Sequence, residues 1–139
     1  MSSNELATVT GVVSQSSPYS VDETLQQIEQ VLRERGLTIF ARFDHSGEAG
    51  KVGLTMQPAH VLVFGNPKAG TPLMIASPLI ALDLPLKILV WQDPQKQVWV
   101  SYAEPSSLAQ RYSIPPELVT VLAAAHGIVE AALHQVNAK

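Results

Sequence analysis

The chain has 139 residues, no cysteine and a formal net charge of −3. Since a domain has about 150 residues on average, we expect one domain over residues 1–139. The absence of cysteine excludes disulfides and thiolate metal sites, and the scattered basic residues exclude a nucleic-acid surface.

Charged residues make up 15% of the chain, against about 25% in an average domain. So little charge favours a homo-oligomer that buries uncharged surface. The amino terminus lacks the basic start and apolar run of a signal peptide, and the apolar stretch Pro72–Leu82 is too short to span a bilayer. We therefore expect a cytoplasmic protein that makes no contact with membranes.

The first elements are read from alternation and capping. Val9 and Val13 predict a strand over residues 7–14. Ser20 and Glu23 form a capping box, and apolar residues then recur at helical spacing. A helix is expected to follow this box and to stop at Gly36.

Further elements follow in chain order. Alternating or continuous apolar runs predict strands over residues 37–43, 60–64, 86–91 and 98–102. Caps and helical spacing predict helical segments over 46–53, 73–82, 105–112 and 115–136. In this reading Ser46 caps the first segment, and Thr71-Pro72 starts the second, which is interrupted at Ser77-Pro78.

This order predicts an α+β fold. The expected architecture is a two-layer sandwich, with a mixed sheet of about five strands and two long helices on one face. Those helices are the segment after Ser20 and the segment after Pro115. The other face of the sheet is left for loops or for a second subunit.

Asp44-His45 follows a predicted strand and is the first candidate site. A carboxylate beside an imidazole can orient a base or supply a metal ligand. Alternatively, Asp44 caps the following loop and His45 packs locally. Neighbouring residues of a strand point to opposite faces, which argues against their acting together.

Residues 64–72 resemble a small anion cradle. The glycines allow close approach of the backbone, Lys68 supplies positive charge, and Thr71 would open a helix with free amides. The order and spacing of a Walker loop are absent. The alternative is a plain connection between a strand and a helix.

His126, Glu130 and His134 stand four residues apart on the last predicted helix. The two histidines are about 12 Å apart by helical rise, so one metal ion cannot bind both. This stripe is expected to be a solvated or interface face, and no metal or cofactor is predicted. Hydrolase, zincin and dinucleotide motifs are absent, and the sequence leaves enzymatic activity open.

Several motifs together resemble the "domain of unknown function 302" family of small bacterial α+β domains. They include Asp44-His45, Phe64-Gly-Asn-Pro67 and Leu82-Asp-Leu-Pro-Leu86, and they extend over about residues 10–133. The resemblance implies a compact fold that forms homodimers, and it implies no established reaction. The motif positions that it transfers to this chain are Asp44, His45, Gly65, Asn66, Pro67, Thr71, Asp83 and Pro85.

The leading hypothesis is a dimeric module that binds a small polar or anionic ligand. Its expected cleft is lined by Asp44, His45, Asn66, Lys68, Thr71 and Asp83. One alternative is a structural or regulatory homodimer without a ligand. Another is a hydrolase-like enzyme in which His45 is the general base, with Asp83 or Asp44 as its partner.

Overall fold

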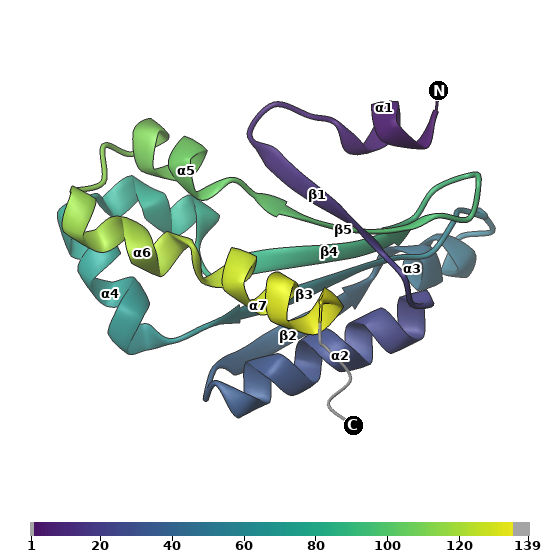
Figure 1. Ribbon diagram of the computed structural model, residues 1–139, viewed down its shortest axis with the longest axis horizontal. Helices are drawn as coiled ribbons and strands as arrows, with labels where there is room; N and C mark the ends of the chain where they lie inside the picture. Colours follow the sequence, from purple (N-terminus) through teal and green to yellow (C-terminus); the bar gives the residue numbers. More distant parts are fainter. Residues whose placement is uncertain (1, 135–139) are drawn as a thin grey trace.

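The computed structural model describes residues 2–134 and shows a five-stranded sheet with helices around it (Figure 1). The strands are β1 (Val12–Ser17), β2 (Thr38–Asp44), β3 (Ala59–Gly65), β4 (Leu86–Gln92) and β5 (Val98–Ala103). Their order in the sheet is β1-β5-β4-β3-β2, and all neighbouring pairs are antiparallel. The α+β class and the five strands are confirmed.

The expected mixed sheet is wrong. A parallel pair requires a connection that crosses from one end of the sheet to the other. The connections β2–β3, β3–β4 and β4–β5 instead return the chain at the end of the sheet where it left, whether they contain helices or only the β4–β5 turn, so each strand runs opposite to its neighbour.

The helices differ greatly in length. They are α1 (Ser3–Ala7), α2 (Val21–Glu34), α3 (His45–Lys51), α4 (Pro67–Ala76), α5 (Pro105–Arg111), α6 (Val119–Leu122) and α7 (Ala124–Leu133). Two 3₁₀ turns, η1 (Pro78–Asp83) and η2 (Pro116–Leu118), accompany α4 and α6.

Helix α2 forms as the sequence predicts. The Ser20 hydroxyl accepts from the Glu23 N–H, and the Glu23 carboxylate accepts from the Ser20 N–H. Its apolar side chains form one buried stripe, with Leu25, Ile28 and Leu32 at most 1% exposed.

The chain starts two other elements at different places from those expected. The first strand begins only at Val12, because α1 extends to Ala7 and a turn follows it, in which the Val12 N–H donates to the Val9 carbonyl and Gly11 has a φ of 82°. Helix α4 begins at Pro67, so Thr71 is not its cap and Pro72 lies inside it. Asn66 is the cap, since its side-chain oxygen accepts from the Lys68 N–H and Pro67 fills the first helical position.

The expected second long helix is not formed. The segment after Pro115 divides into η2, α6 and α7, with a break at Ala123. Val119, Thr120 and Val121 are three successive β-branched residues, which weaken a continuous helix. The predicted end of this helix at Val136 lies outside the described residues.

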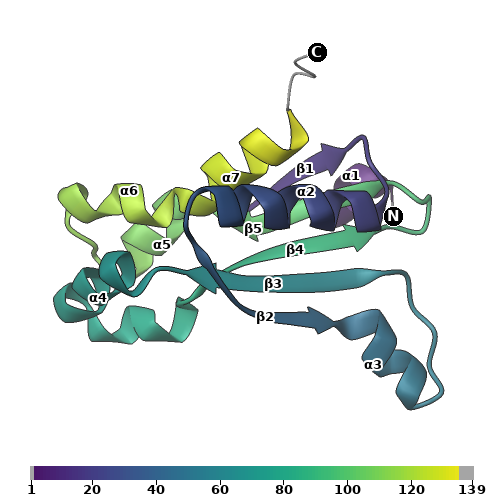
Figure 2. The ribbon, with the colours of Figure 1, turned by 90° about the horizontal axis from the view of Figure 1, so that it is seen from below.

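Helices α2 and α7 cover one face of the sheet (Figure 2). Between them and the strands lies the main core, in which Ile28, Leu62, Phe64, Val100 and Val129 are fully buried. Pro116–Leu133 is the only stretch within residues 2–134 whose length and mean hydropathy suit a membrane span, and 33% of it is buried. Core helices pass the same test, and the α7 part of this stretch belongs to the core.

We call the opposite side of the sheet the open face. Figure 2 shows α3 and α4 projecting on this side from opposite ends of β3. Strand register gives the open face a row of side chains across its middle, with Phe43 beside Val61, then Leu89, then Ser101. In residues 2–134 no long helix covers this row.

Candidate functional site

The structure separates the six residues of the expected cleft. Asp44 pairs with His60 at one end of the β2–β3 ladder, while Thr38 pairs with Gly65 at the other. Six residues of strand span about 20 Å. Asp44 and His45 are therefore at one end of the sheet, and Asn66, Lys68 and Thr71 follow the other end.

Asp44 has a structural task at the start of α3. It accepts hydrogen bonds from the Ser46 hydroxyl and from the Gly47 N–H at 2.8 Å, so Asp44 and not Ser46 is the cap. These two bonds hold the pKa of Asp44 below its usual value. His60 Nε2 lies 3.7 Å from the same carboxylate, and His60 Nδ1 is buried without a hydrogen-bond partner within the described residues.

Within residues 2–134, His45 has no carboxylate bonded to it. Its side chain is exposed at the first position of α3, and neither Asp44 nor Asp83 bonds to it. Asp83 instead accepts from the Tyr112 hydroxyl and from Arg111 Nη1, which is 3.3 Å away. The bond to Asp83 raises the pKa of Tyr112. This geometry gives no support to His45 as a general base.

The backbone N–H groups at the start of α4, in the expected anion cradle, already donate to Asn66, the cap of this helix. Pro67 has no N–H, the Lys68 N–H donates to Asn66 Oδ1, and the Ala69 and Gly70 N–H groups donate to the Asn66 carbonyl. The three distances are all 2.9 Å. The Lys68 side chain is exposed to solvent.

A pocket of about 240 Å³ lies beside this end of α4. Five parts of the chain meet there: the start of β2, the end of β3, α4, the segment between η1 and β4, and the α6–α7 junction. Its walls are formed by Leu37, Phe40, Phe64, Gly65, Asn66, Pro67, Ala69, Gly70, Thr71, Leu73, Met74, Leu84, Pro85, Leu86, Val121 and Ala124. Apart from Asn66 and Thr71, these side chains are apolar or absent.

A β-bulge supplies one wall of the pocket. Ile39 pairs with Phe64 and Ala41 with Val63, so Phe40 is the extra residue between them. Bulges redirect side chains at the edges of sheets, and Phe40 here lines the pocket while 49% exposed. A Cβ placed on Gly65 would lie 3.4 Å from the Phe40 ring, so Gly65 and Phe40 are neighbours in this wall.

Sequence reasoning identified only part of this pocket. The motif positions Gly65, Asn66, Pro67, Thr71 and Pro85 do line it. The apolar walls from β2 and from the α6–α7 junction were missed, because they are distant in sequence and have no motif of their own. Lys68 and Asp83, which were expected in the cleft, are not among its walls.

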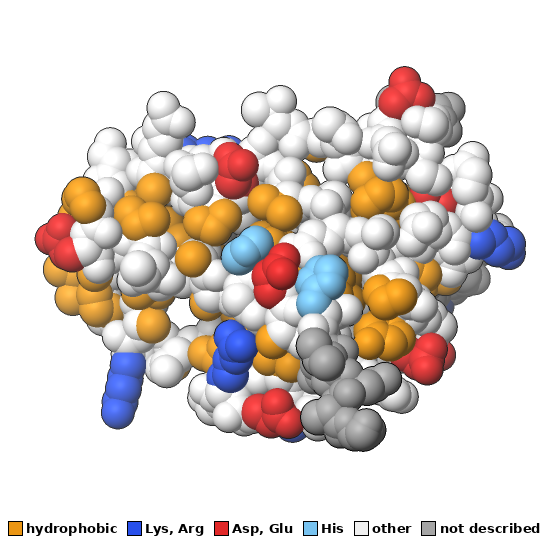
Figure 3. Space-filling model, in the orientation of Figure 1, with side chains coloured by type: hydrophobic (Ala, Val, Ile, Leu, Met, Phe, Trp, Pro, Cys, Tyr) orange, Lys and Arg blue, Asp and Glu red, His pale blue; other side chains and the backbone are white. Residues whose placement is uncertain are grey.

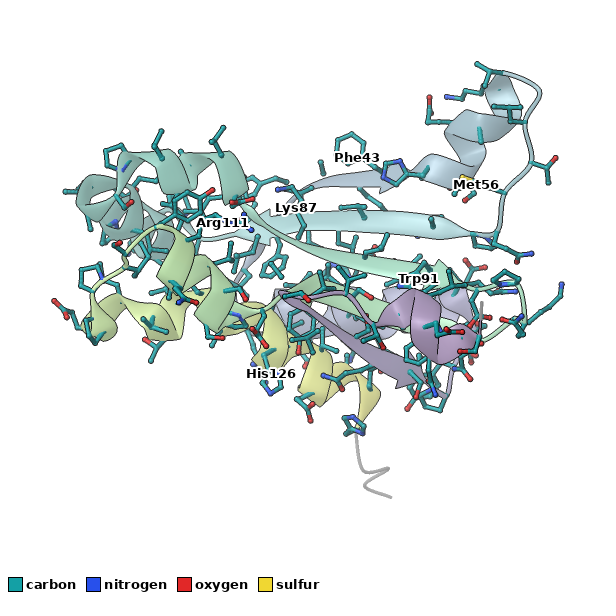
Figure 4. The ribbon with its side chains drawn as sticks, turned by 90° about the horizontal axis from the view of Figure 1, so that it is seen from above. Phe43, Met56, Lys87, Trp91, Arg111 and His126 are labelled. Atoms are coloured by element: carbon teal, nitrogen blue, oxygen red, sulfur yellow. The ribbon has the colours of Figure 1, made fainter. Side chains whose placement is uncertain are left out.

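A second, wider hollow of about 510 Å³ lies on the open face. His45 and Asp83 both line it, together with apolar side chains such as Val61 and Leu89. Figure 4 shows Phe43, Met56, Lys87 and Arg111 on this side of the sheet and His126 on the other. The hollow is a shallow, largely apolar surface.

The predicted histidine stripe lies on the helix-covered side, where Figure 3 shows two histidines flanking an acidic side chain. His126 Nδ1 is 2.6 Å from the Tyr102 hydroxyl, and His134 is 3.9 Å from Glu130. Burial raises the pKa of Tyr102. No cluster of three metal-ligating side chains occurs within residues 2–134.

Comparison with known proteins agrees with this fold. The family model "Domain of unknown function DUF302" matches residues 13–133, and the chain belongs to that family. A crystal structure titled as an uncharacterized conserved protein DUF302 from Bacillus stearothermophilus superposes with a TM-score of 0.75 at 20% identity. The match covers 91% of this chain and 98% of that one, and it shows the fold alone.

Two relatives are named as fluoride-specific ion channels. The chain is 38% identical over 104 residues to "Fluoride-specific ion channel FluC 1" of Brucella suis biovar 1 and to "Fluoride-specific ion channel FluC 2" of Brucella melitensis biotype 1. Those residues are 75% of this chain, but only 41% and 38% of the two relatives. The chain thus matches about two fifths of each channel protein.

Proposed function

We propose that this chain is a homodimeric module that binds a small ligand in the pocket beside α4. The observation that carries the proposal is the pocket itself, where five separate parts of the chain border a space of about 240 Å³ that is partly open to solvent. Apolar pockets with a few polar groups are the usual sites for small molecules. The motif glycine Gly65 and the motif asparagine Asn66 both belong to its walls.

A pair of glycine variants tests this proposal. Gly70 lines the pocket, and a Cβ at Gly70 or at Gly50 of α3 would meet nothing within 4 Å. Leucine at Gly70 should therefore occupy the pocket, whereas leucine at Gly50 should not affect it. Both changes replace a helical glycine, and at both positions the added Cβ meets no other atom within 4 Å, so neither variant introduces a clash at the Cβ.

The measurement is native mass spectrometry of the purified chain, followed by the same sample under denaturing conditions. We expect the native spectrum of the parent to show a small additional mass from a bound ligand. The control Gly50→Leu should retain this mass, and Gly70→Leu should lose it. The proposal is contradicted if the parent retains no additional mass and also binds none of three small probes, benzyl alcohol, benzoate and benzylammonium.

The homodimer is supported by the open face. Phe43 and Met56 are 54% and 46% exposed there, and Val61 and Leu89 lie in the same apolar row. A contiguous apolar surface of this kind marks an interaction site. Charged residues make up only 15% of the chain, which also favours burial of uncharged surface against a second copy.

A charge on the open face tests the homodimer. Size-exclusion chromatography with light scattering should give twice the 15.0 kDa chain mass for the parent. Leu89→Lys should give the monomer mass, because it places a second cation beside Lys87 in the middle of the open face. Gln26→Lys adds the same charge at an exposed position of α2, away from the open face, and should leave the dimer intact. A monomeric parent overturns this part of the proposal.

The two alternative hypotheses differ in the results that would support them. A homodimer without a ligand remains the outcome if no mass and no probe binds. The hydrolase-like enzyme lacks a carboxylate bonded to His45 in residues 2–134, so we do not favour it. The occurrence of a similar region within proteins named as channels supports a binding module, and a cytoplasmic location stays a prediction.

A further inference from the structure

We infer that the pocket beside α4 takes a neutral, compact, largely apolar molecule with one hydrogen-bond acceptor, and not an anion. This inference rests on the proposed ligand-binding function and specifies the class of its ligand. The glycine-rich segment at residues 64–72 suggests by itself an anionic ligand, whereas the folded structure favours a neutral one.

The first argument is the charge of the walls. None of the residues that line the pocket is acidic or basic. An anion placed against apolar side chains loses its hydration without gaining a partner, which is strongly unfavourable. Lys68, the nearest cation in sequence, extends into solvent, where its attraction for a bound anion would be screened.

The second argument is the state of the backbone amides. Helix amino termini bind anions through N–H groups that have no partner inside the helix. In α4 the N–H groups of Lys68, Ala69 and Gly70 all donate to Asn66, at 2.9 Å, and Pro67 has none. An anion would therefore have to displace the cap before it met a free donor.

The third argument is size and shape. An engineered apolar cavity of about 150 Å³ holds benzene, so about 240 Å³ has room for a substituted ring. The aromatic ring of Phe40 forms one wall, and Gly70 leaves open space where another side chain would stand. These walls suit a compact ring better than an extended chain.

The fourth argument concerns Asn66, one of the two polar side chains in the walls, the other being Thr71. Asn66 Oδ1 is committed to the Lys68 N–H, whereas the Asn66 amide nitrogen has no hydrogen bond within residues 2–134. Asn66 is exposed and lines the pocket, so its amide nitrogen is available as a donor to a ligand bound there. A ligand with one acceptor oxygen and an apolar body satisfies both this donor and the apolar walls.

Three probes of similar size and different charge test the inference: benzyl alcohol, benzoate and benzylammonium. Each is titrated into the isotopically labelled chain and followed by ¹H–¹⁵N spectra. We expect benzyl alcohol to bind at least tenfold more tightly than either ion. Gly70→Leu should weaken its binding at least tenfold, as should the second blocking variant Ala69→Leu, while Gly50→Leu should not.

The outcomes separate the inference from the proposed function. Benzoate or benzylammonium binding as tightly as benzyl alcohol, with the same loss in Gly70→Leu, overturns the neutral ligand but keeps the pocket as a site. Binding of benzyl alcohol that is equal in the parent and in both blocking variants places it elsewhere and overturns the inference. If no probe binds and no mass is retained, the proposed function itself fails.

Discussion

Helices α3 and α4 begin alike and end in different surroundings. Each follows a strand of the same hairpin, each is capped by an Asx side chain, Asp44 or Asn66, and each contains glycine. Yet α3 has no buried residue, whereas α4 packs Leu73 fully into the second core cluster. The α4 end borders the compact apolar pocket, whereas His45 of α3 borders only the wider hollow of the open face.

The difference lies in what reaches each helix from elsewhere in the chain. Against α4 come η1, the α6–α7 junction and the bulged start of β2. Against α3 comes little beyond the edge of β3, where the Ala59 N–H donates to the Ser46 hydroxyl at 3.3 Å. A local capping signal fixes where a helix starts, and distant segments decide whether a binding site forms beside it.

Removing buried volume should show the largest contrast. Leu73→Ala deletes a side chain that is 0% exposed and should lower the free energy of unfolding by about 2–5 kcal/mol. Leu54→Ala, just after α3, deletes one that is 65% exposed and should change it by no more than about 0.5 kcal/mol. Urea denaturation measures both, and equal losses would contradict the difference in packing.

The two caps should differ in their dependence on pH. Asn66→Ala should cost about 1 kcal/mol at every pH, because an amide does not titrate. Asp44→Ala should destabilise the chain near neutral pH only. The folded-state pKa of Asp44 is held low by the Ser46 hydroxyl and the Gly47 N–H, so its stabilisation is present above its unfolded pKa of about 3.9 and is lost as pH falls through the lower folded value.

Denaturation of the parent and of both variants between pH 7 and pH 3 checks this expectation. The gap between the parent and Asp44→Ala should close at the acid end, while the gap to Asn66→Ala should persist. A gap to Asp44→Ala that widened with acid would show that the cap does not hold the charged form.

Alanine at the helical glycines should give the smallest effects. Gly50→Ala and Gly70→Ala should each raise the free energy of unfolding by up to about 1 kcal/mol, since their added Cβ atoms meet nothing within 4 Å. Gly47→Ala should lower it, because its Cβ would lie 2.6 Å from Asp44 Oδ2 and disturb the cap. Thermal unfolding followed by circular dichroism compares the stabilities of the three variants with that of the parent. A Gly47→Ala variant more stable than the parent would contradict this expectation.

Much of the fold could be predicted because the signals were local. The capping box of α2 and the β4–β5 hairpin depend on residues close in sequence, and both form as expected. The break at Ala123 and the early start of α4 depend on competition between neighbouring signals. The sequence analysis favours Thr71 as the cap of this helix, whereas Asn66, five residues earlier and followed by Pro67, is the cap that forms.

The site was harder to predict, because strand direction decides which loops meet. The ends of two parallel strands would bring Asp44 and Asn66 to the same edge of the sheet. In the antiparallel β2–β3 pair they lie at opposite ends, and the expected cleft divides. The pocket walls from Phe40 and Val121 arise from a bulge and from a distant helix, which no short motif reveals.

The most direct test of the pocket is a map of the ¹H–¹⁵N shifts that benzyl alcohol causes in the parent chain. We predict that the perturbed amides cluster at the α4 end, at Gly65, Gly70 and Leu73, and that Gly47 and Gly50 of α3 do not shift. Shifts centred on α3, or no saturable shifts at all, would contradict the assignment of the binding site to the α4 end.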